Sequence, residues 1–254
     1  MSATVWQDEA PGVTGQPRLC QVRVSGPGIE NYCYGLIDPQ SGASLLVDPA
    51  WDLARIERAV FEAGGRRVTG VLLTHGHPDH TDLAGVVARR WSCPVRIGEG
   101  DLGLIDVASV AALPLRDGER VPLGATSVTA VATPGHTPGS FCFLTSDRAL
   151  TGDTVFIEGV GIPGDGPGAM EDLYASVQRL KRLVPGGSTV HPGHSYGRDP
   201  GETMANLRDL NIYLQFTDLP AFAAFRSRRP IAAPRRVHAP CVHRSTPSSC
   251  SATQ

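Results

Sequence analysis

Three histidines and an aspartate occur within six residues, at His75, His77, Asp79 and His80, separated only by a glycine and a proline. Glycine and proline make a regular helix unfavourable across this segment. In an extended turn, the two-residue step from His75 to His77 lets both imidazoles converge on one ion. Asp79 and His80 point in another direction and can serve a second ion. Imidazole and carboxylate ligands suit zinc, iron or manganese, so the segment predicts metal binding.

Three further candidates occur later in the chain, at His136, Asp153 and His194. Each lies after a predicted strand and is preceded by a glycine, which permits the tight turn that aims a side chain inward. Taken singly, each residue is more typical of a turn than of a metal site. Together with the first cluster, they complete a candidate ligand set drawn from four loops.

The segments around these residues predict a layered α/β domain, because short apolar runs alternate with helical patterns. The run over 68–73, directly before the first cluster, is apolar almost throughout, as in a strand covered on both faces. Two strand-rich halves with covering helices indicate an αββα sandwich whose loops converge at one edge. The expected strands are 19–24, 32–37, 43–47, 68–73, 95–97, 127–132, 140–145, 148–151 and 188–191, and the expected helices are 52–63, 83–91, 170–184 and one or two within 201–226.

The two ends of the chain lack this alternation. Residues 1–17 are expected to form a flexible arm, and residues 228–254 are dominated by Pro, Ser, Arg and Ala without periodicity. Such a tail cannot bury enough apolar surface to fold, so we expect it to be disordered. A single domain is therefore predicted over 18–227.

The composition excludes several classes of protein and partner. With 254 residues, 41% apolar and 19% charged, the chain is typical of a globular protein, and a net charge of -2 gives no reason to expect nucleic acid. No apolar run reaches the roughly 18 residues of a membrane span. The first 17 residues also lack the pattern of a signal peptide. The six cysteines are scattered, which indicates reduced thiols and a cytoplasmic location.

The order of the motifs resembles the metallo-β-lactamase superfamily. H-x-H-x-D-H is followed by G-H, G-D and P-G-H over roughly residues 18–215. The resemblance implies the metallo-β-lactamase fold and two divalent ions, foremost Zn²⁺, with iron or manganese as alternatives. It assigns the first ion to His75, His77 and His136, and the second to Asp79, His80 and His194, with Asp153 bridging both.

Within the superfamily, the residues around Asp153 and His194 are similar to glyoxalase II and its relatives. Those relatives usually continue with a G-C-G-R stretch, where this chain has Gly-Val-Gly-Ile-Pro-Gly at 159–164. They also carry a longer C-terminal helical domain that binds glutathione. The shorter C-terminus here resembles glyoxalase II-like hydrolases of polyketide and peptide assembly lines, which cleave acyl chains from carrier proteins. Bacterial β-lactamases have a cysteine or a non-bridging residue in place of Asp153 and are usually exported, so antibiotic hydrolysis is not expected.

The expected reaction is hydrolysis of a thioester of a carrier protein, coenzyme A or a glutathione-like thiol. A hydroxide bridging two cations attacks the carbonyl carbon, a cation stabilises the oxyanion, and Asp79 orients the hydroxide. A thiolate needs little protonation to leave, which agrees with the lack of an obvious general acid. Three alternatives stay open: a lactonase or ester hydrolase with the same site, a mononuclear iron persulfide dioxygenase, and a non-enzymatic module that binds carrier proteins.

Weaker candidates have structural interpretations beside functional ones. Asp48 is either a carboxylate that orients a ligand histidine or an ordinary turn residue. His191 is expected to be a buried histidine rather than a ligand. Asn31, Tyr32 and Tyr34 either border the substrate cleft or belong to the core. The segment 159–169 is either a substrate loop or a plain connector.

Overall fold

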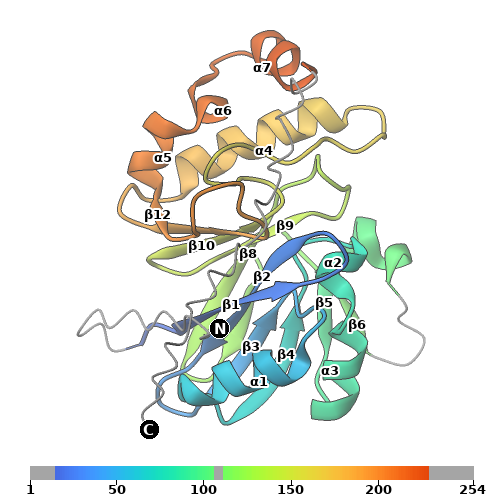
Figure 1. Ribbon diagram of the computed structural model, residues 1–254, viewed down its shortest axis with the longest axis vertical. Coiled ribbons are helices and arrows are strands. Elements are labelled where there is room, and N and C mark those ends of the chain that lie inside the picture. Colours follow the sequence, from blue (N-terminus) through green and yellow to red (C-terminus); the bar gives the residue numbers. More distant parts are fainter. Residues whose placement is uncertain (1–14, 106–110, 229–254) are drawn as a thin grey trace, which may run out of the picture.

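Two six-stranded β-sheets lie face to face, and helices cover the outer face of each sheet (Figure 1). The structure, a computed structural model, describes residues 15–105 and 111–228. Over these residues it has the αββα architecture that the sequence predicts. The arm expected over 1–17 and the tail expected over 228–254 fall almost entirely outside the described residues. The proposed limits of the domain therefore stay a prediction.

The first sheet changes from antiparallel to parallel pairing across its width. Strands β1 to β3 pair antiparallel, and β3 to β6 pair parallel. Parallel neighbours require crossover connections, which helices α1 and α3 supply on the outer face. The strands in spatial order are β1 (Arg18–Ser25), β2 (Glu30–Ile37), β3 (Ala43–Val47), β4 (Arg67–Leu72), β5 (Val95–Gly98) and β6 (Ala112–Leu115), and the helical segments are α1 (Leu53–Glu62), α2 (Pro78–Thr81), α3 (Ala84–Trp91) and the 3-10 helix η1 (Glu99–Leu104).

The second sheet is antiparallel except where β10 and β11 run parallel, joined by the long helix α4. The predicted stripe of Leu173, Val177 and Leu180 on α4 is fully buried. The strands, in reverse spatial order, are β7 (Arg120–Leu123), β8 (Thr126–Ala132), β9 (Phe141–Leu144), β10 (Arg148–Gly152), β11 (Thr189–Pro192) and β12 (Glu202–Thr203), and the helices are α4 (Ala169–Leu183), α5 (Met204–Leu210), α6 (Ile212–Gln215) and α7 (Leu219–Arg226).

The end of the described chain holds three short helices, where the sequence predicted one or two. The Asn211 side chain accepts a hydrogen bond from the Tyr213 amide and begins α6. The Asp218 side chain accepts one from the Ala221 amide and begins α7. These N-caps stabilise new helix starts, so the apolar pattern is divided rather than continuous.

Strands β6, β7 and β12 were not predicted. Pro114 lies in β6 and Pro122 in β7, and each of these strands forms an edge of its sheet. Proline removes a backbone donor, so it is tolerated at an edge although it is typical of non-strand sequence. β12 has only two residues, too few to give a pattern.

Three apolar cores hold the layers together. The core between the sheets includes Leu36, Leu72, Leu123, Phe143 and Leu150. The core under α1 and α3 includes Ile56, Val60, Val71 and Val87. The core under α4 to α7 includes Leu173, Val177, Leu180 and Phe222. Because both sheets are buried on both faces, their relative position is well defined, and loops from both can build one site.

The strand directions bring all candidate ligands to one edge of the sandwich. In the first sheet β3, β4 and β5 run parallel, and the first histidine cluster follows β4. In the second sheet β8 and β10 both pair antiparallel with β9, and β11 is parallel to β10. His136, Asp153 and His194 follow these three strands. Carboxyl ends of strands are the usual place for a site in α/β folds.

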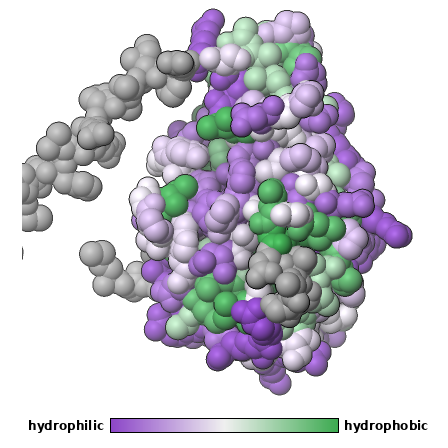
Figure 2. Space-filling model, turned by 90° about the vertical axis from the view of Figure 1, so that its right-hand side faces the viewer, coloured by the Kyte–Doolittle hydropathy of each residue, from purple (hydrophilic) through white to green (hydrophobic). Residues whose placement is uncertain are grey.

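Exposed apolar residues are distributed over the surface. On the face that lies to the right in Figure 1, apolar residues form several separate patches among polar ones (Figure 2). The large apolar side chains with the greatest exposure are Ile162, Tyr196 and Leu104. Within the described residues, no helix has both the length and the apolar character needed to cross a membrane.

Candidate metal centre

The first group of candidate ligands combines the loop after β4 with the loop after β8. His75, His77 and His136 each offer a ligand atom, and these atoms lie within 4.8 Å of one another. Nε2 of His75 lies 3.0 Å from Nδ1 of His77, and Nε2 of His136 lies 3.0 Å from that same Nδ1. Three imidazole nitrogens therefore face one small volume, where a cation could accept their lone pairs.

Hydrogen bonds on the opposite ring nitrogen determine which nitrogen faces the group. Nδ1 of His136 lies 2.7 Å from the carbonyl oxygen of Ile162 and donates to it. Nδ1 of His75 lies 3.1 Å from Oγ1 of Thr74, which in turn donates to Asp48 at 2.6 Å. With Nδ1 protonated in both rings, each Nε2 keeps its lone pair for a metal.

The second group combines the loops after β4 and β11. Asp79, His80 and His194 place their ligand atoms within 4.8 Å of one another. Nε2 of His80 and Nε2 of His194 lie 3.3 Å apart, and Oδ2 of Asp79 lies 3.3 Å from Nε2 of His194. The far nitrogens are again engaged, by Asp48 for His80 and by the carbonyl oxygen of Glu30 for His194.

Asp153 lies between the two groups. Its Oδ2 is 3.6 Å from Nε2 of His136 in the first group and 3.4 Å from Nε2 of His194 in the second. Its Oδ1 is 3.4 Å from Nε2 of His80. The structure thus brings together all seven residues that the sequence singled out.

The residues present fit a metal centre by two observations. Oδ1 of Asp153 is buried and has no hydrogen-bond partner among the described residues, although an unpaired buried carboxylate oxygen is costly. The surrounding imidazole nitrogens face one another rather than hydrogen-bond donors. Divalent cations would satisfy both the orphaned oxygen and the converging lone pairs.

The electrostatics of the centre favour positive charge. Burial opposes ionisation of Asp153, but His80 and His194 outweigh it and hold the pKa of its carboxyl far below the usual range. Burial likewise opposes protonation of His194, yet hydrogen bonds to Asp153 and Asp79 raise its pKa to about 10. Burial lowers the pKa of His75 well below its usual value, so that this imidazole is neutral. The Asp153 carboxylate and the His75 imidazole are therefore in the forms that bind metal ions, whereas His194 would release a proton when an ion binds.

Two polar side chains brace the second group. Oδ2 of Asp48 lies 3.0 Å from Nδ1 of His80, and both of its oxygens accept hydrogen bonds from Thr74. This geometry agrees with the interpretation of Asp48 as a carboxylate that orients a histidine. Nδ2 of Asn31 donates to the backbone carbonyl of Asp79 at 2.8 Å and to its Oδ2 at 3.2 Å. Asn31 therefore supports a candidate ligand directly.

The remaining weak candidates lie outside the two groups. His191 is buried and interacts with Thr189 and Gln21. Its pKa is lowered to about 3, by burial and then by the charge of Arg148. Tyr34 is a core residue whose hydroxyl donates to the carbonyl of Pro192 at 2.6 Å. The hydroxyl of Tyr32 donates to Asp199.

The segment 159–169 is tied to the centre rather than running free as a connector. Ile162 accepts the hydrogen bond from His136, and the Gly164 amide donates to the carbonyl of Gly135 at 2.8 Å. A Cβ at Gly161 would lie 2.0 Å from the carbonyl oxygen of Asp153, so only glycine permits this approach. Whether the segment also contacts substrate stays a prediction.

Asp101, in η1, is a buried carboxylate that the sequence did not single out. It accepts hydrogen bonds from the Gly76 amide and from Thr137, each beside a candidate ligand. Nothing in its local sequence distinguishes it from a surface aspartate near the start of a helical turn. Only the long-range contact between loops identifies it.

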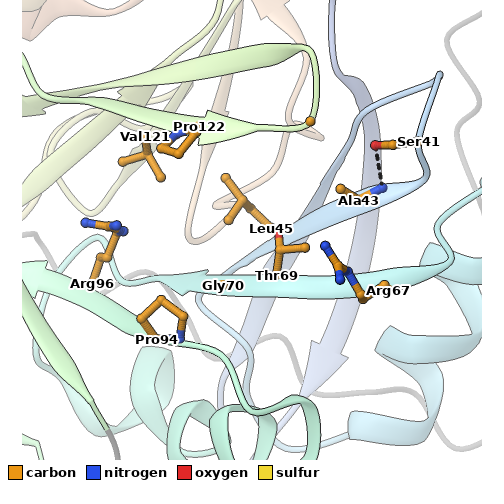
Figure 3. A pocket seen from close by; sticks show the side chains of 11 residues that line it. Ser41, Ala43, Leu45, Arg67, Thr69, Gly70, Pro94, Arg96, Val121 and Pro122 are labelled. Carbon is orange, nitrogen blue, oxygen red and sulfur yellow. Dashed lines mark hydrogen bonds between the residues drawn. The ribbon is translucent and has the colours of Figure 1, made fainter.

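Two cavities differ in their relation to the centre. A cavity of about 450 Å³ adjoins His194 and is lined by the turn between β1 and β2 and by Ser195 and Tyr196. Another, of about 400 Å³, lies at the opposite edge of the sandwich, where β3 and β4 begin (Figure 3). There Arg67 and Arg96 flank Leu45 and Thr69. Of these two cavities, only the first is lined by a candidate ligand.

Comparison with known proteins agrees with this geometry. The family model described as the Metallo-beta-lactamase superfamily matches residues 34–194. A probable polyketide biosynthesis zinc-dependent hydrolase of Bacillus velezensis is 36% identical over 199 residues, covering 78% of this chain and 88% of that protein. A hydroxyacylglutathione hydrolase of Methylococcus capsulatus is 35% identical over 201 residues, covering 78% and 71% respectively.

A different activity also occurs among the relatives. The mitochondrial persulfide dioxygenase of Homo sapiens is 30% identical over 204 residues, covering 79% of this chain and 77% of that protein. The crystal structure of ETHE1 from Myxococcus xanthus superposes with a TM-score of 0.71 and 28% identity, covering 85% of this chain and 92% of that one. The likeness thus extends across hydrolases and an oxygenase.

Proposed function

Because the chain belongs to the metallo-β-lactamase superfamily, we propose that it is a dinuclear metal-dependent hydrolase that cleaves a thioester. The observation that carries this proposal is the convergence of two adjacent ligand groups, with the Asp153 carboxylate between them. Two groups linked by one carboxylate are suited to two ions rather than one.

The ligand assignment follows the two groups. His75, His77 and His136 would hold the first ion, and Asp79, His80 and His194 the second, with Asp153 shared. Nitrogen-rich ligation with carboxylates suits Zn²⁺, while iron and manganese accept the same donors. Bound divalent ions would lower the pKa of a coordinated water towards neutrality and polarise a carbonyl group.

We assign to Asp79 the role of orienting the attacking water. Its side chain is 25% exposed, whereas that of its neighbour His80 is fully buried, so Asp79 reaches the solvent side of the centre. The amide of Asn31 fixes its Oδ2, which leaves the carboxylate one preferred orientation. A carboxylate held in this way can accept a hydrogen bond from water and point its lone pair at a carbonyl carbon.

A thioester suits the rest of the site better than an ester does. All the histidines of the centre belong to the ligand groups, so none of them is spare as a general acid for an alkoxide. A thiolate leaves with little protonation. The exposed Ile29 and Tyr196 line the cavity beside His194 and offer apolar surface to an acyl chain. The carrier can be a small thiol or a carrier protein, because the cavity is open at the surface.

Persulfide oxygenation is the second candidate, favoured by the relatives and by one feature of the centre. His75, His80 and Asp153 also form a compact group, with the two-histidine, one-carboxylate composition found in non-haem iron oxygenases. That group, however, leaves His77, His136 and His194 without a role. Two ions use every ligand.

The test combines metal analysis with a substrate panel. We expect close to two zinc ions per chain after purification and reconstitution, with hydrolysis of acyl thioesters exceeding that of matched esters and lactones. One tightly held iron, together with oxygen consumption on a persulfide, would replace the proposal with the dioxygenase. Lactone hydrolysis far above thioester hydrolysis would keep the metal centre but change the bond.

We also propose a reducing, cytoplasmic setting. The four cysteines in the described residues, Cys20, Cys33, Cys93 and Cys142, are buried and free. Burial raises the pKa of Cys33 and Cys142, the latter to about 11, which makes these thiols unreactive. Cys241 and Cys250 lie outside the described residues. Fractionation of the native cells would test the location.

A further inference from the structure

Asp101 connects two loops that come from different sheets. Its side chain is fully buried, and it accepts three hydrogen bonds. Oδ2 accepts from the Gly76 amide at 2.7 Å and from the Thr137 hydroxyl at 2.6 Å. Oδ1 accepts from the Gly139 amide at 2.8 Å. One carboxylate thus links the loop after β4 to the loop after β8.

Two of these three donors, Gly76 and Thr137, lie beside a candidate ligand of the first ion. Gly76 separates His75 from His77, and Thr137 follows His136 directly. The distances between the three imidazoles therefore depend on how the two loops are held together. No donor to Asp101 lies next to a ligand of the second group.

Glycines allow the close approach that this connection needs. A Cβ at Gly98 would lie 2.2 Å from the carbonyl oxygen of Gly139, and one at Gly100 would lie 2.8 Å from the Gly139 amide nitrogen. A Cβ at Gly139 would in turn lie 2.5 Å from the Asp101 amide nitrogen. The backbone of 98–101 therefore runs directly against the loop after β8, with no side chain between them.

The hydroxyl network around Asp101 has a single consistent direction. The Thr137 hydroxyl donates its proton to Asp101 and so accepts from the Ser140 hydroxyl, 2.7 Å away. The Ser140 oxygen accepts from the Thr137 amide at 3.0 Å. Such a network holds the loop in one conformation, because each hydroxyl proton has one acceptor.

Within residues 15–105 and 111–228, Asp101 has no basic partner. The ion pairs found in the described part of the chain include none to Asp101. A buried carboxylate held only by neutral donors is costly, and a neutral side chain would be cheaper for packing alone. Divalent ions at the adjacent centre would supply the missing positive charge.

We infer that Asp101 is a positioning residue that sets the geometry of the three-histidine group and thereby its affinity for the first ion. The inference rests on the metal-binding part of the proposed function and not on the bond that is cleaved. Removing a carboxylate that orients metal ligands typically lowers metal affinity 10- to 100-fold. We expect a loss of that size at one ion and little change at the other.

Asp101→Asn is the direct test, and Asp38→Asn is its matched control. Asp38 is also an almost fully buried aspartate, held by the amide and hydroxyl of Ser41 at the opposite edge of the sandwich. Zinc affinities are measured by chelator competition on the full chain. The absorption spectrum of the cobalt-substituted protein reports ligand geometry, which a general loss of stability would not alter.

A second pair of variants keeps the inference testable if Asp101→Asn does not fold. Thr137→Val removes one of the three donors, and Thr137→Ser keeps it. We expect Thr137→Val to weaken the binding of one zinc ion and to alter the cobalt spectrum, each less than Asp101→Asn does. Thr137→Ser should restore the zinc affinity and the spectrum. Asp38→Asn should retain the zinc affinities and the spectrum of the unaltered protein.

Wild-type zinc affinity and cobalt spectrum in both Asp101→Asn and Thr137→Val would overturn the inference and leave the proposed hydrolase intact. The same would hold if Asp38→Asn lost as much zinc affinity as Asp101→Asn. If the unaltered protein bound no metal, the proposed function itself would fail and the inference with it. If it bound two ions but cleaved no thioester, only the assigned bond would be wrong, and the positioning role would still be measured.

Discussion

Three candidate histidine ligands are oriented by hydrogen bonds to the ring nitrogen that faces away from the proposed ions. His136, His194 and His80 each have one ring nitrogen engaged, by Ile162, Glu30 and Asp48 respectively. These contacts select the tautomer and the ring orientation, so little reorganisation is needed when an ion binds. Substitutions that leave these hydrogen bonds intact and change a group facing the ions are therefore the best tests of the centre.

Asp79→Ala should separate turnover from substrate binding. The change removes a proposed ligand of the second ion and the group proposed to orient the water. We expect kcat on a thioester to fall by more than about 100-fold with little change in KM, because the acyl and thiol arms bind elsewhere. The comparison is Asp209→Ala, an exposed aspartate on α5, which should leave both constants unchanged. Near-normal turnover in Asp79→Ala would contradict the assigned role.

His191 predicts a pH dependence of stability that is independent of the metal. Burial lowers its pKa in the folded protein to about 3, whereas an unfolded histidine titrates near 6.5. Between these values the unfolded chain binds a proton that the folded protein does not. Stability is therefore lost as pH falls from about 6.5 towards 3, by up to about 1.4 kcal/mol per pH unit.

His191→Gln should weaken this dependence. Denaturant unfolding of both proteins, with chelator present, would give the free energy of unfolding from pH 7 to pH 4.5. We expect a shallower slope in the variant, whatever its stability at pH 7. Equal slopes would show that His191 is protonated in the folded protein.

The candidate ligands could be singled out from the sequence, and their convergence expected, because their spacing is itself chemical information. A cluster such as His75 to His80 has few other uses, and glycines before His136 and His194 mark loops that turn inward. Asp101 and Asn31 carry no such mark. Their roles depend on contacts between segments far apart in the chain, which spacing cannot reveal.

At the scale of elements, the loop after β11 shows how closely the backbone approaches the centre. A Cβ at Gly193 would lie 2.5 Å from Cε1 of His80 and 2.7 Å from Oδ1 of Asp153. Gly193→Ala should therefore displace ligands of both ions and lower zinc affinity by about 10-fold or more. Gly187→Ala, in the loop before β11, is the matched control, since its Cβ would meet nothing within 4 Å. Equal zinc affinities in the two variants would argue against the proposed second group.

The helices and strands were predictable where burial produces a recognisable pattern of apolar residues in the sequence. The α4 stripe and the apolar β4 run are both signatures of an element packed on its neighbours. Edge strands β6 and β7 escaped because half of their residues are exposed and each contains a proline. The division of 201–226 into three helices depends on caps at Asn211 and Asp218 within an apolar pattern.

At the scale of the whole molecule, the candidate centre lies between two halves, each built on its own β-sheet. The first sheet contributes His75, His77, Asp79 and His80, and the second contributes His136, Asp153 and His194. Ions bound between the sheets would therefore link them in addition to the apolar core. Metal binding and the stability of the sandwich should be thermodynamically coupled.

Removing the metal should consequently lower the melting temperature of the entire domain rather than loosen one loop. At free zinc 100 times the dissociation constant, one site contributes about 2.7 kcal/mol. For a domain of this size that corresponds to roughly 5–10 °C. We expect a single cooperative transition that moves upward with zinc concentration and returns on chelation. In His136→Ala, which lacks a ligand from the second sheet, the zinc-dependent shift should shrink. An unchanged melting temperature across zinc and chelator would mean that no ion links the two sheets.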